Sequence, residues 1–184
     1  KVVRNFTKKS LVVVDMPFKT YTNKFSALKN ARKIIKLTNC HAVKLEGGKE
    51  IVNTINYLVK RSIPVMGHIG LLPQSSKNFT LKGKKISEKR RILNDAIAIS
   101  NAGVFAMVIE CVVEDLAKKI SKAVPVPTIG IGASKHCDGQ ILVTDDMLGL
   151  SYRTPKFVKK YSNLRSKIEK GIKEYSKDVK NKKF

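Results

Sequence analysis

The stretches AVKLEGG (residues 42–48) and PVMGHIG (residues 64–70) are short, mostly apolar runs that end in glycine. Runs of this length and composition are typical of strands buried in a parallel sheet. Side chains alternate between the two faces of a strand, so Lys44 and Glu46 share one face. We therefore expect Val43 and Leu45 to point the other way, toward covering helices.

Four further runs of the same kind extend the pattern: residues 11–15 (LVVVD), 106–110 (AMVIE), 127–132 (PTIGIG) and 140–144 (QILVT). The segments between the runs carry apolar residues at helical spacing, as in residues 25–35 and 51–59. Strands that alternate with helices predict an α/β fold with right-handed crossovers. The connection between the fifth and sixth runs is too short for a full helix.

The C-terminal segment departs from this alternation. Apolar residues from Phe157 to Tyr175 recur at steps of three and four, which predicts an apolar stripe on one or two helices. We expect residues 156–184 to form a helical tail that either packs on the domain or makes a subunit contact, and residues after Ser176 to fray. Since no repeat or linker divides the sequence, residues 1–184 are predicted to form a single domain.

The composition is that of a globular protein, with 184 residues of which 42% are hydrophobic and 28% charged. No apolar run approaches the roughly 18 residues of a membrane span, so no membrane partner is expected. The three cysteines cannot all pair within the chain and lack zinc-ligand spacing. Together with the absence of an apolar leader after Lys1, this favours a cytoplasmic protein.

The formal net charge of +23 suggests a nucleic-acid partner at first sight. However, the lysines are spread along the whole chain, and few aromatic residues lie among them to stack on bases. We find no helix-turn-helix, zinc-finger or RNA-recognition pattern. A lysine-biased, solvated surface accounts for the charge, and no specific nucleic-acid partner is expected.

Four of the predicted strands end in side chains that can do chemistry. These side chains are Asp15, Lys44 with Glu46, His68 and Glu110. The carboxyl ends of parallel strands gather on one face of an α/β fold, and that face carries the site. Asp15 and Glu46 offer the oxygen ligands that Mg²⁺ takes, and Glu110, in apolar surroundings, suits a general base or acid.

Each of these residues also has a structural explanation that the sequence leaves open. Lys44, Glu46 and Glu110 could form salt bridges, Asp15 could cap a turn, and His68 could be a buried core histidine. Two other features are rejected as catalytic. Residues 130–134 (GIGAS) lack the third glycine of a dinucleotide loop, and Cys111 has no evident base partner.

Several stretches in series resemble the ketopantoate hydroxymethyltransferase family, in an order and spacing that agree from about residue 1 to residue 161. The stretches are residues 11–18 (LVVVDMPF), 43–48 (VKLEGG), 64–75 (PVMGHIGLLPQS), 109–112 (IECV), 129–133 (IGIGA) and 138–143 (DGQILV). The resemblance implies a (β/α)₈ TIM barrel that assembles into homodecamers.

The resemblance also implies an activity and roles for residues. The family transfers a hydroxymethyl group from 5,10-methylenetetrahydrofolate to 3-methyl-2-oxobutanoate, giving 2-dehydropantoate in pantothenate biosynthesis, and Mg²⁺ holds the oxo acid. By motif match, Asp15 would be a metal ligand and a substrate contact, and Glu46 would belong to the metal shell. Lys44 would bind the oxo acid, and His68 would lie near it. Glu110 would be the proton acceptor.

The family's barrel has two strands upstream of the segment that matches Lys1, or roughly 70 residues of a barrel of about 250. They carry a Gly-Asp-Ser motif with another metal ligand. We therefore expect a TIM barrel lacking its first two strands. Ser134, Asp145 and the lysine-rich loop 76–85 also depart from the family's pattern. The alternatives are an inactive fragment, a basic non-catalytic binding module or, more distantly, another Mg²⁺-enolate barrel such as a relative of phosphoenolpyruvate mutase or isocitrate lyase.

Overall fold

The computed structural model describes residues 1–76 and 78–183. The chain divides into two compact units, Lys1–Gln140 and Ile141–Phe184. The first unit contains the first five predicted strands, the first residue of the sixth, and all five candidate site residues. The second unit begins before residue 156, where we expected the helical tail to start.

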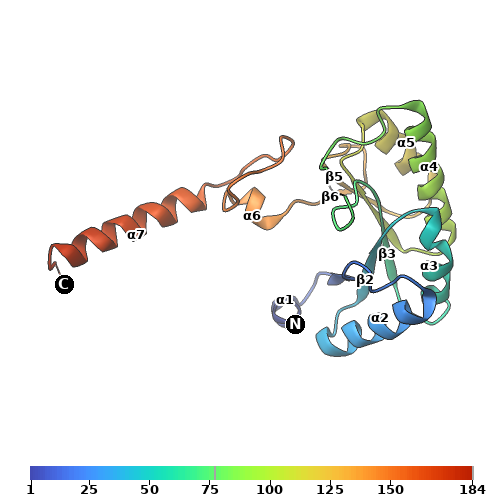
Figure 1. The fold of residues 1–184 in the computed structure, drawn as a ribbon, viewed down its shortest axis with the longest axis horizontal. Helices are drawn as coiled ribbons and strands as arrows, with labels where there is room; N and C mark the ends of the chain where they lie inside the picture. Colours follow the sequence, from blue (N-terminus) through green and yellow to red (C-terminus); the bar gives the residue numbers. More distant parts are fainter. Residues whose placement is uncertain (77, 184) are drawn as a thin grey trace. The chain divides into compact units, whose positions relative to one another are not determined.

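Unit 1 is built on a parallel sheet whose six strands lie side by side in chain order. The sheet curls into a half-barrel, with a helix in each crossover from β1 to β5 and none in the short connection from β5 to β6, as expected (Figure 1). A sequential parallel order with helical crossovers is the arrangement of a TIM barrel. The α/β prediction is confirmed, and the fold is consistent with part of such a barrel. The strands are β1 (Val13–Asp15), β2 (Ala42–Glu46), β3 (Val65–Gly70), β4 (Ala106–Glu110), β5 (Thr128–Ile131) and β6 (Gly139–Gln140).

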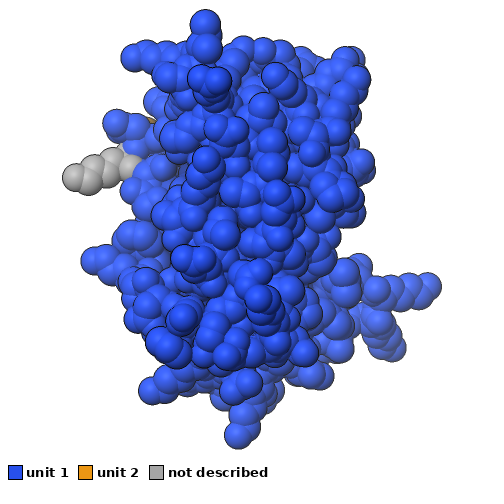
Figure 2. All heavy atoms as spheres, turned by 90° about the vertical axis from the view of Figure 1, so that its right-hand side faces the viewer, with its two compact units in different colours: residues 1–140 blue, residues 141–184 orange. Residues whose placement is uncertain are grey.

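Helices cover one face of this sheet. Figure 1 shows α2 to α5 on one side of the strands, and Figure 2 turns the helix-covered side of unit 1 toward the viewer. The side chain of Asn23 starts α2 by accepting from the backbone N–H of Ser26, and Asn39 ends it in a left-handed conformation. The helices of unit 1 are α1 (Val2–Phe6), α2 (Lys24–Thr38), the 3₁₀ turn η1 (Lys49–Ile51), α3 (Val52–Val59), α4 (Ile86–Asn101) and α5 (Glu114–Ala123).

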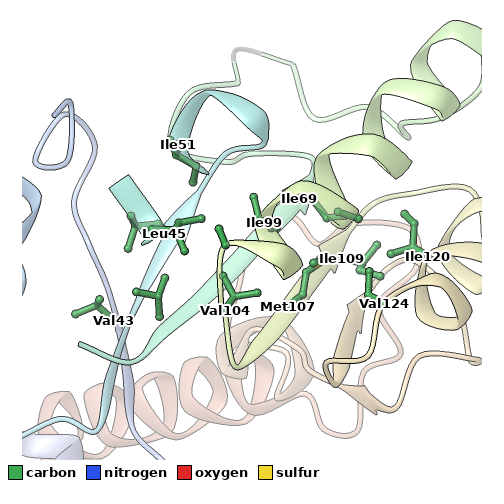
Figure 3. Packing of buried hydrophobic residues seen from close by; sticks show 14 of the residues in the cluster. Val43, Leu45, Ile51, Ile69, Ile99, Val104, Met107, Ile109, Ile120 and Val124 are labelled. Atoms are coloured by element: carbon green, nitrogen blue, oxygen red, sulfur yellow. The ribbon is translucent and has the colours of Figure 1, made fainter. Parts of the chain in front are cut away.

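The hydrophobic core lies between the helices and the outer face of the strands. Val43 and Leu45 of β2 are fully buried, as expected, and so are Met107 and Ile109 of β4. Figure 3 shows them in one layer with Ile99 of α4. Burying such side chains contributes about 1.5–3 kcal/mol each, so this face supplies much of the folding free energy of unit 1.

Three predictions about the C-terminal third were wrong. The strand expected over residues 140–144 is only β6, because the chain turns at residue 141 toward the short helix α6 (Thr144–Met147). The tail helix α7 (Leu164–Lys180) begins where Asn163 caps it, so Phe157 and Tyr161 lie outside it. Residues 177–180 continue the helix rather than fray. None of the helices in the described part of the chain is both long and apolar enough to cross a membrane.

Candidate active site

The register of the parallel strands brings five polar side chains to the carboxyl end of the sheet. Asp15 pairs with Lys44, and Glu46 pairs with His68. Glu110 pairs with Gly70, two residues beyond His68, and so points to the same face as that histidine. This is the face opposite the helices, that is, the inside of the curved sheet. The prediction that four strand ends converge is confirmed, whereas the roles of the residues stay predictions.

Lys44 lies at the centre of the cluster. Its Nζ is 3.2 Å from Oδ2 of Asp15 and 3.8 Å from Oε1 of Glu46. It is also 2.9 Å from Nδ1 of His68. The Lys44 side chain is only 12% exposed and that of Glu46 only 5%, so each charge needs the other to offset its lost hydration.

His68 connects Lys44 with Glu110. An ammonium can only donate a hydrogen bond, so the Nδ1 that faces Lys44 acts as the acceptor and a neutral ring carries its proton on Nε2. That Nε2 lies 3.3 Å from Oε2 of Glu110, but it is not aligned for a hydrogen bond and has no other partner among the described residues. A small rotation of either side chain would align them, and His68 therefore lies where it can orient Glu110.

Two residues that the sequence analysis did not single out hold Glu46. The backbone N–H of Gln74 donates to Oε2 of Glu46 at 3.1 Å, and the hydroxyl of Tyr21 donates to its backbone carbonyl at 3.4 Å. Burial raises the pKa of Tyr21, which keeps the hydroxyl a donor. Gln74 belongs to the quoted stretch 64–75, but Tyr21 gives no sequence signal because its contact depends on how the loop after β1 folds.

Gly70 lets β3 and β4 approach at the position where Glu110 leaves the sheet. Its φ of +92° lies in the region that favours glycine, and an added Cβ would lie 2.3 Å from the carbonyl oxygen of Glu110. The N–H of Leu71 donates to that same carbonyl at 2.8 Å. The backbone of Glu110 is therefore fixed by a glycine and a hydrogen bond.

A surface hollow of about 430 Å³ opens beside Glu46. Its walls combine apolar side chains such as Phe18, Tyr21 and Leu72 with the Glu46 carboxylate and several hydroxyl groups. This volume lies within the usual range for small-molecule sites, and so does the mixture of apolar walls with a few polar groups. The hollow gives a ligand access to one edge of the charged cluster.

The cluster has a formal charge of −2, from three carboxylates and one ammonium with His68 neutral, in a chain whose net charge is +23. Asp15 and Glu46 both lie within 4 Å of Lys44 Nζ, and Mg²⁺ commonly takes one or two carboxylates with water and substrate as its other ligands. The donor set fits such a cation. Within residues 1–76 and 78–183, no three His, Cys, Asp or Glu side chains form a fuller metal-binding group.

Cys111 follows Glu110 and is half-buried. Burial raises the pKa of its thiol, and the neighbouring Glu110 carboxylate raises it further. A catalytic thiol needs the opposite shift, because the thiolate is the nucleophile. This direction gives no support for a nucleophilic role of Cys111.

Comparison with known proteins gives consistent results. The family model for ketopantoate hydroxymethyltransferase matches residues 1–184. A 3-methyl-2-oxobutanoate hydroxymethyltransferase of Pelagibacter ubique is 55% identical over 184 residues, which cover 100% of this chain and 72% of that protein. Proteins of the same name from Phenylobacterium zucineum and Bartonella tribocorum are 51% and 50% identical over 100% of this chain, covering 68% and 69% of their own lengths.

Proposed function

This chain belongs to the ketopantoate hydroxymethyltransferase family, and from that premise we propose that it transfers a hydroxymethyl group to 3-methyl-2-oxobutanoate in pantothenate biosynthesis. The donor would be 5,10-methylenetetrahydrofolate, and the product 2-dehydropantoate. The observation that carries the proposal is the convergence of Asp15, Lys44, Glu46, His68 and Glu110 at one end of the sheet.

Glu110 is the proposed base. Its carboxylate would take the proton from the carbon next to the keto group, and the resulting enolate carbon would form the new bond to the one-carbon unit of the folate. The bonds from that unit to the folate nitrogens would break, water would supply the hydroxyl oxygen, and tetrahydrofolate would leave. The proposal is supported by the buried ring of His68 at 3.3 Å, which would hold Glu110 in position. Since Glu110 is 14% exposed, it remains accessible to a small substrate.

Lys44 is the proposed partner for the negative charge of the oxo acid. Its ammonium is already fixed by Asp15, Glu46 and His68, so little side-chain freedom is lost when substrate binds. A preorganised cation that faces developing negative charge is an efficient way to stabilise a transition state. His68 would link this cation to the base.

Asp15 and Glu46 are the residues that would hold Mg²⁺. When bound, the ion would draw electron density from the carboxylate and keto oxygens of the oxo acid and so acidify the neighbouring C–H. The N–H of Gln74 would orient the Glu46 carboxylate, as partners of metal ligands commonly do. The homodecamer implied by the resemblance and the cytoplasmic location expected from the sequence stay predictions.

The test follows the proton rather than the complete reaction. The protein is incubated with 3-methyl-2-oxobutanoate and Mg²⁺ in D₂O, and proton NMR records loss of the signal at the carbon next to the keto group. We expect exchange faster than in buffer, and a drop of about 100-fold or more in Glu110→Gln, because a positioned base contributes about that much. Exchange by the wild-type chain no faster than buffer would favour the inactive fragment or the basic binding module.

A further inference from the structure

The ring of His68 is enclosed between two charged side chains, one at each of its nitrogens. Nδ1 lies 2.9 Å from Nζ of Lys44, and Nε2 lies 3.3 Å from Oε2 of Glu110. The side chain is only 4% exposed, so water has little access to either nitrogen. The two neighbours therefore decide which nitrogen carries the proton of the ring.

The backbone of His68 holds the ring in this position. His68 lies within β3 and is paired in register with residues of both β2 and β4. Its carbonyl accepts from the backbone N–H of Gly47 at 3.1 Å. Because a strand on each side fixes this residue, the ring stays between Lys44 and Glu110.

Lys44 excludes a proton from Nδ1. An ammonium has three donors and no acceptor, so a hydrogen on Nδ1 would point at another hydrogen across only 2.9 Å. Oε1 of Glu46 could accept such a hydrogen, but it lies 4.0 Å from Nδ1, beyond hydrogen-bond distance. Nδ1 therefore keeps its lone pair, and the single proton of the neutral ring lies on Nε2.

The proton on Nε2 decides how His68 acts on Glu110. With this proton the ring can donate to Oε2 of Glu110, whereas the other tautomer would place a lone pair opposite the carboxylate. The same Nε2 is buried and has no hydrogen-bond partner within the part of the chain that the structure describes. A buried donor that stays unpaired is costly, which favours the small rotation that pairs it with Glu110.

We propose that Lys44 fixes His68 in the Nε2–H tautomer and that His68, fixed in this way, is a positioning residue for Glu110. The part that concerns Glu110 rests on the proposed function, whereas the tautomer of the ring does not. A histidine is commonly fixed through the hydrogen bond that its other nitrogen makes. Lys44 would then have two tasks, because it would bind the oxo acid and also control the residue that holds the base.

The first test reads the tautomer directly. Long-range nitrogen–proton NMR of the full chain distinguishes an imidazole nitrogen that carries a proton from one that carries a lone pair. The chain has three histidines, so the variants His41→Gln and His136→Gln assign the signals. At neutral pH we expect His68 to have a proton on Nε2 and a lone pair on Nδ1. A proton on Nδ1, alone or in addition, would overturn the proposal.

Substitution of Lys44 tests the cause of this tautomer. Lys44→Met removes the ammonium and leaves Glu46 as a charged neighbour of Nδ1, so we expect Nδ1 to gain a proton that points at this carboxylate. The matched control Lys60→Met removes an exposed lysine at the end of α3 and should leave the His68 signals unchanged. A lone pair that persists on Nδ1 in Lys44→Met would show that another group sets the tautomer.

Two substitutions of His68 separate its contact with Lys44 from its contact with Glu110. His68→Gln places an amide nitrogen near the position of Nε2 and keeps a donor for Glu110, whereas His68→Asn places an amide oxygen near Nδ1 and keeps an acceptor for Lys44. In the deuterium-exchange assay, His68→Asn should lower the maximal rate by about 100-fold, because the base is no longer held in place. His68→Gln should keep most of this rate and mainly raise the concentration of oxo acid needed for half-maximal exchange.

The outcomes separate this inference from the proposed function. Equal maximal rates in the two His68 variants would overturn the positioning role and leave the proposed function standing. No exchange by the wild-type chain would count against the proposed function and against the positioning role that rests on it. The NMR spectra would in that case still decide whether Lys44 sets the tautomer of His68.

Discussion

The two faces of the strands β2 to β4 share one backbone but carry different kinds of side chain. The outer face presents Val43, Leu45, Met107 and Ile109, all fully buried against helices. The inner face presents Lys44, Glu46, His68 and Glu110, which form a connected chain of contacts in which Lys44 touches Glu46 and His68, and His68 touches Glu110. The period of two in a strand thus separates stability from chemistry within the same few residues. On the inner face, each buried charge depends on the opposite charges beside it.

The largest effect is expected on the outer face. Leu45→Ala removes a fully buried side chain from the middle of the core and should lower the free energy of unfolding by about 2–5 kcal/mol. Urea denaturation followed by circular dichroism measures the loss. Leu37→Ala, at a position 59% exposed on α2, is the matched control and should change stability by less than about 0.5 kcal/mol. Equal losses in both variants would contradict the assignment of the core.

The inner face should show coupling instead. Lys44→Met leaves the buried Glu46 carboxylate without its cation and should cost about 3 kcal/mol, the lower end of the range for a broken buried pair. Glu46→Gln in the same chain removes the uncompensated charge, so the double variant should lose at least about 1 kcal/mol less than the sum of the two single variants. Strict additivity in urea denaturation would show that the cluster is not electrostatically connected.

A glycine at the edge of the inner face provides a third test. Gly70→Ala places a Cβ against the carbonyl of Glu110 at a positive φ and should destabilise unit 1 by about 1–3 kcal/mol. Gly171→Ala, where an added Cβ meets nothing within 4 Å, should instead stabilise α7 by about 0.5–1 kcal/mol. Thermal unfolding compares the signs. Two changes of the same sign would mean that the approach of β3 to β4 is looser than the structure indicates.

The sequence predicted the parts of this molecule that repeat. Five strands, their parallel order and the outward direction of Val43 and Leu45 followed from short apolar runs between amphipathic segments. The convergence of Asp15, Lys44, Glu46, His68 and Glu110 followed as well, because strand ends in such a fold share one edge. The sixth strand was predicted to be too long, because residues 141–143 are apolar but lie outside the sheet. Apolarity alone does not distinguish a strand from a segment that leads to a helix. Tyr21 was missed because a loop, which has no period, positions it.

The start of α7 shows the same limit. Phe157 and Tyr161 continue the three-and-four spacing, so the pattern alone extended the helix by more than one turn. The helix begins instead at Leu164, where the side chain of Asn163 accepts from the backbone N–H of Ser166. The capping residue Asn163 thus sets the start of α7, and the spacing of apolar residues does not predict where that start lies.

The smallest effect concerns a polar exception on the outer face. Thr128 of β5 pairs with Met107 and is fully buried, and both its N–H and its hydroxyl donate to Oδ2 of Asp138 at 2.8 Å. These bonds favour the ionised carboxylate and hold the pKa of Asp138 below its ordinary value of 3.8. A pKa that is lower in the folded than in the unfolded state contributes stability above the unfolded value, and this contribution is lost as the pH falls through the folded one.

Asp138→Asn should therefore lower the free energy of unfolding by about 1 kcal/mol or less at pH 7, because the carboxylate is exposed. The loss should become progressively smaller below about pH 4. Urea titrations of both proteins from pH 7 to pH 2.5 measure the difference, and a loss that stays constant over that range would show that packing around Thr128, rather than the charge of Asp138, stabilises this end of the sheet.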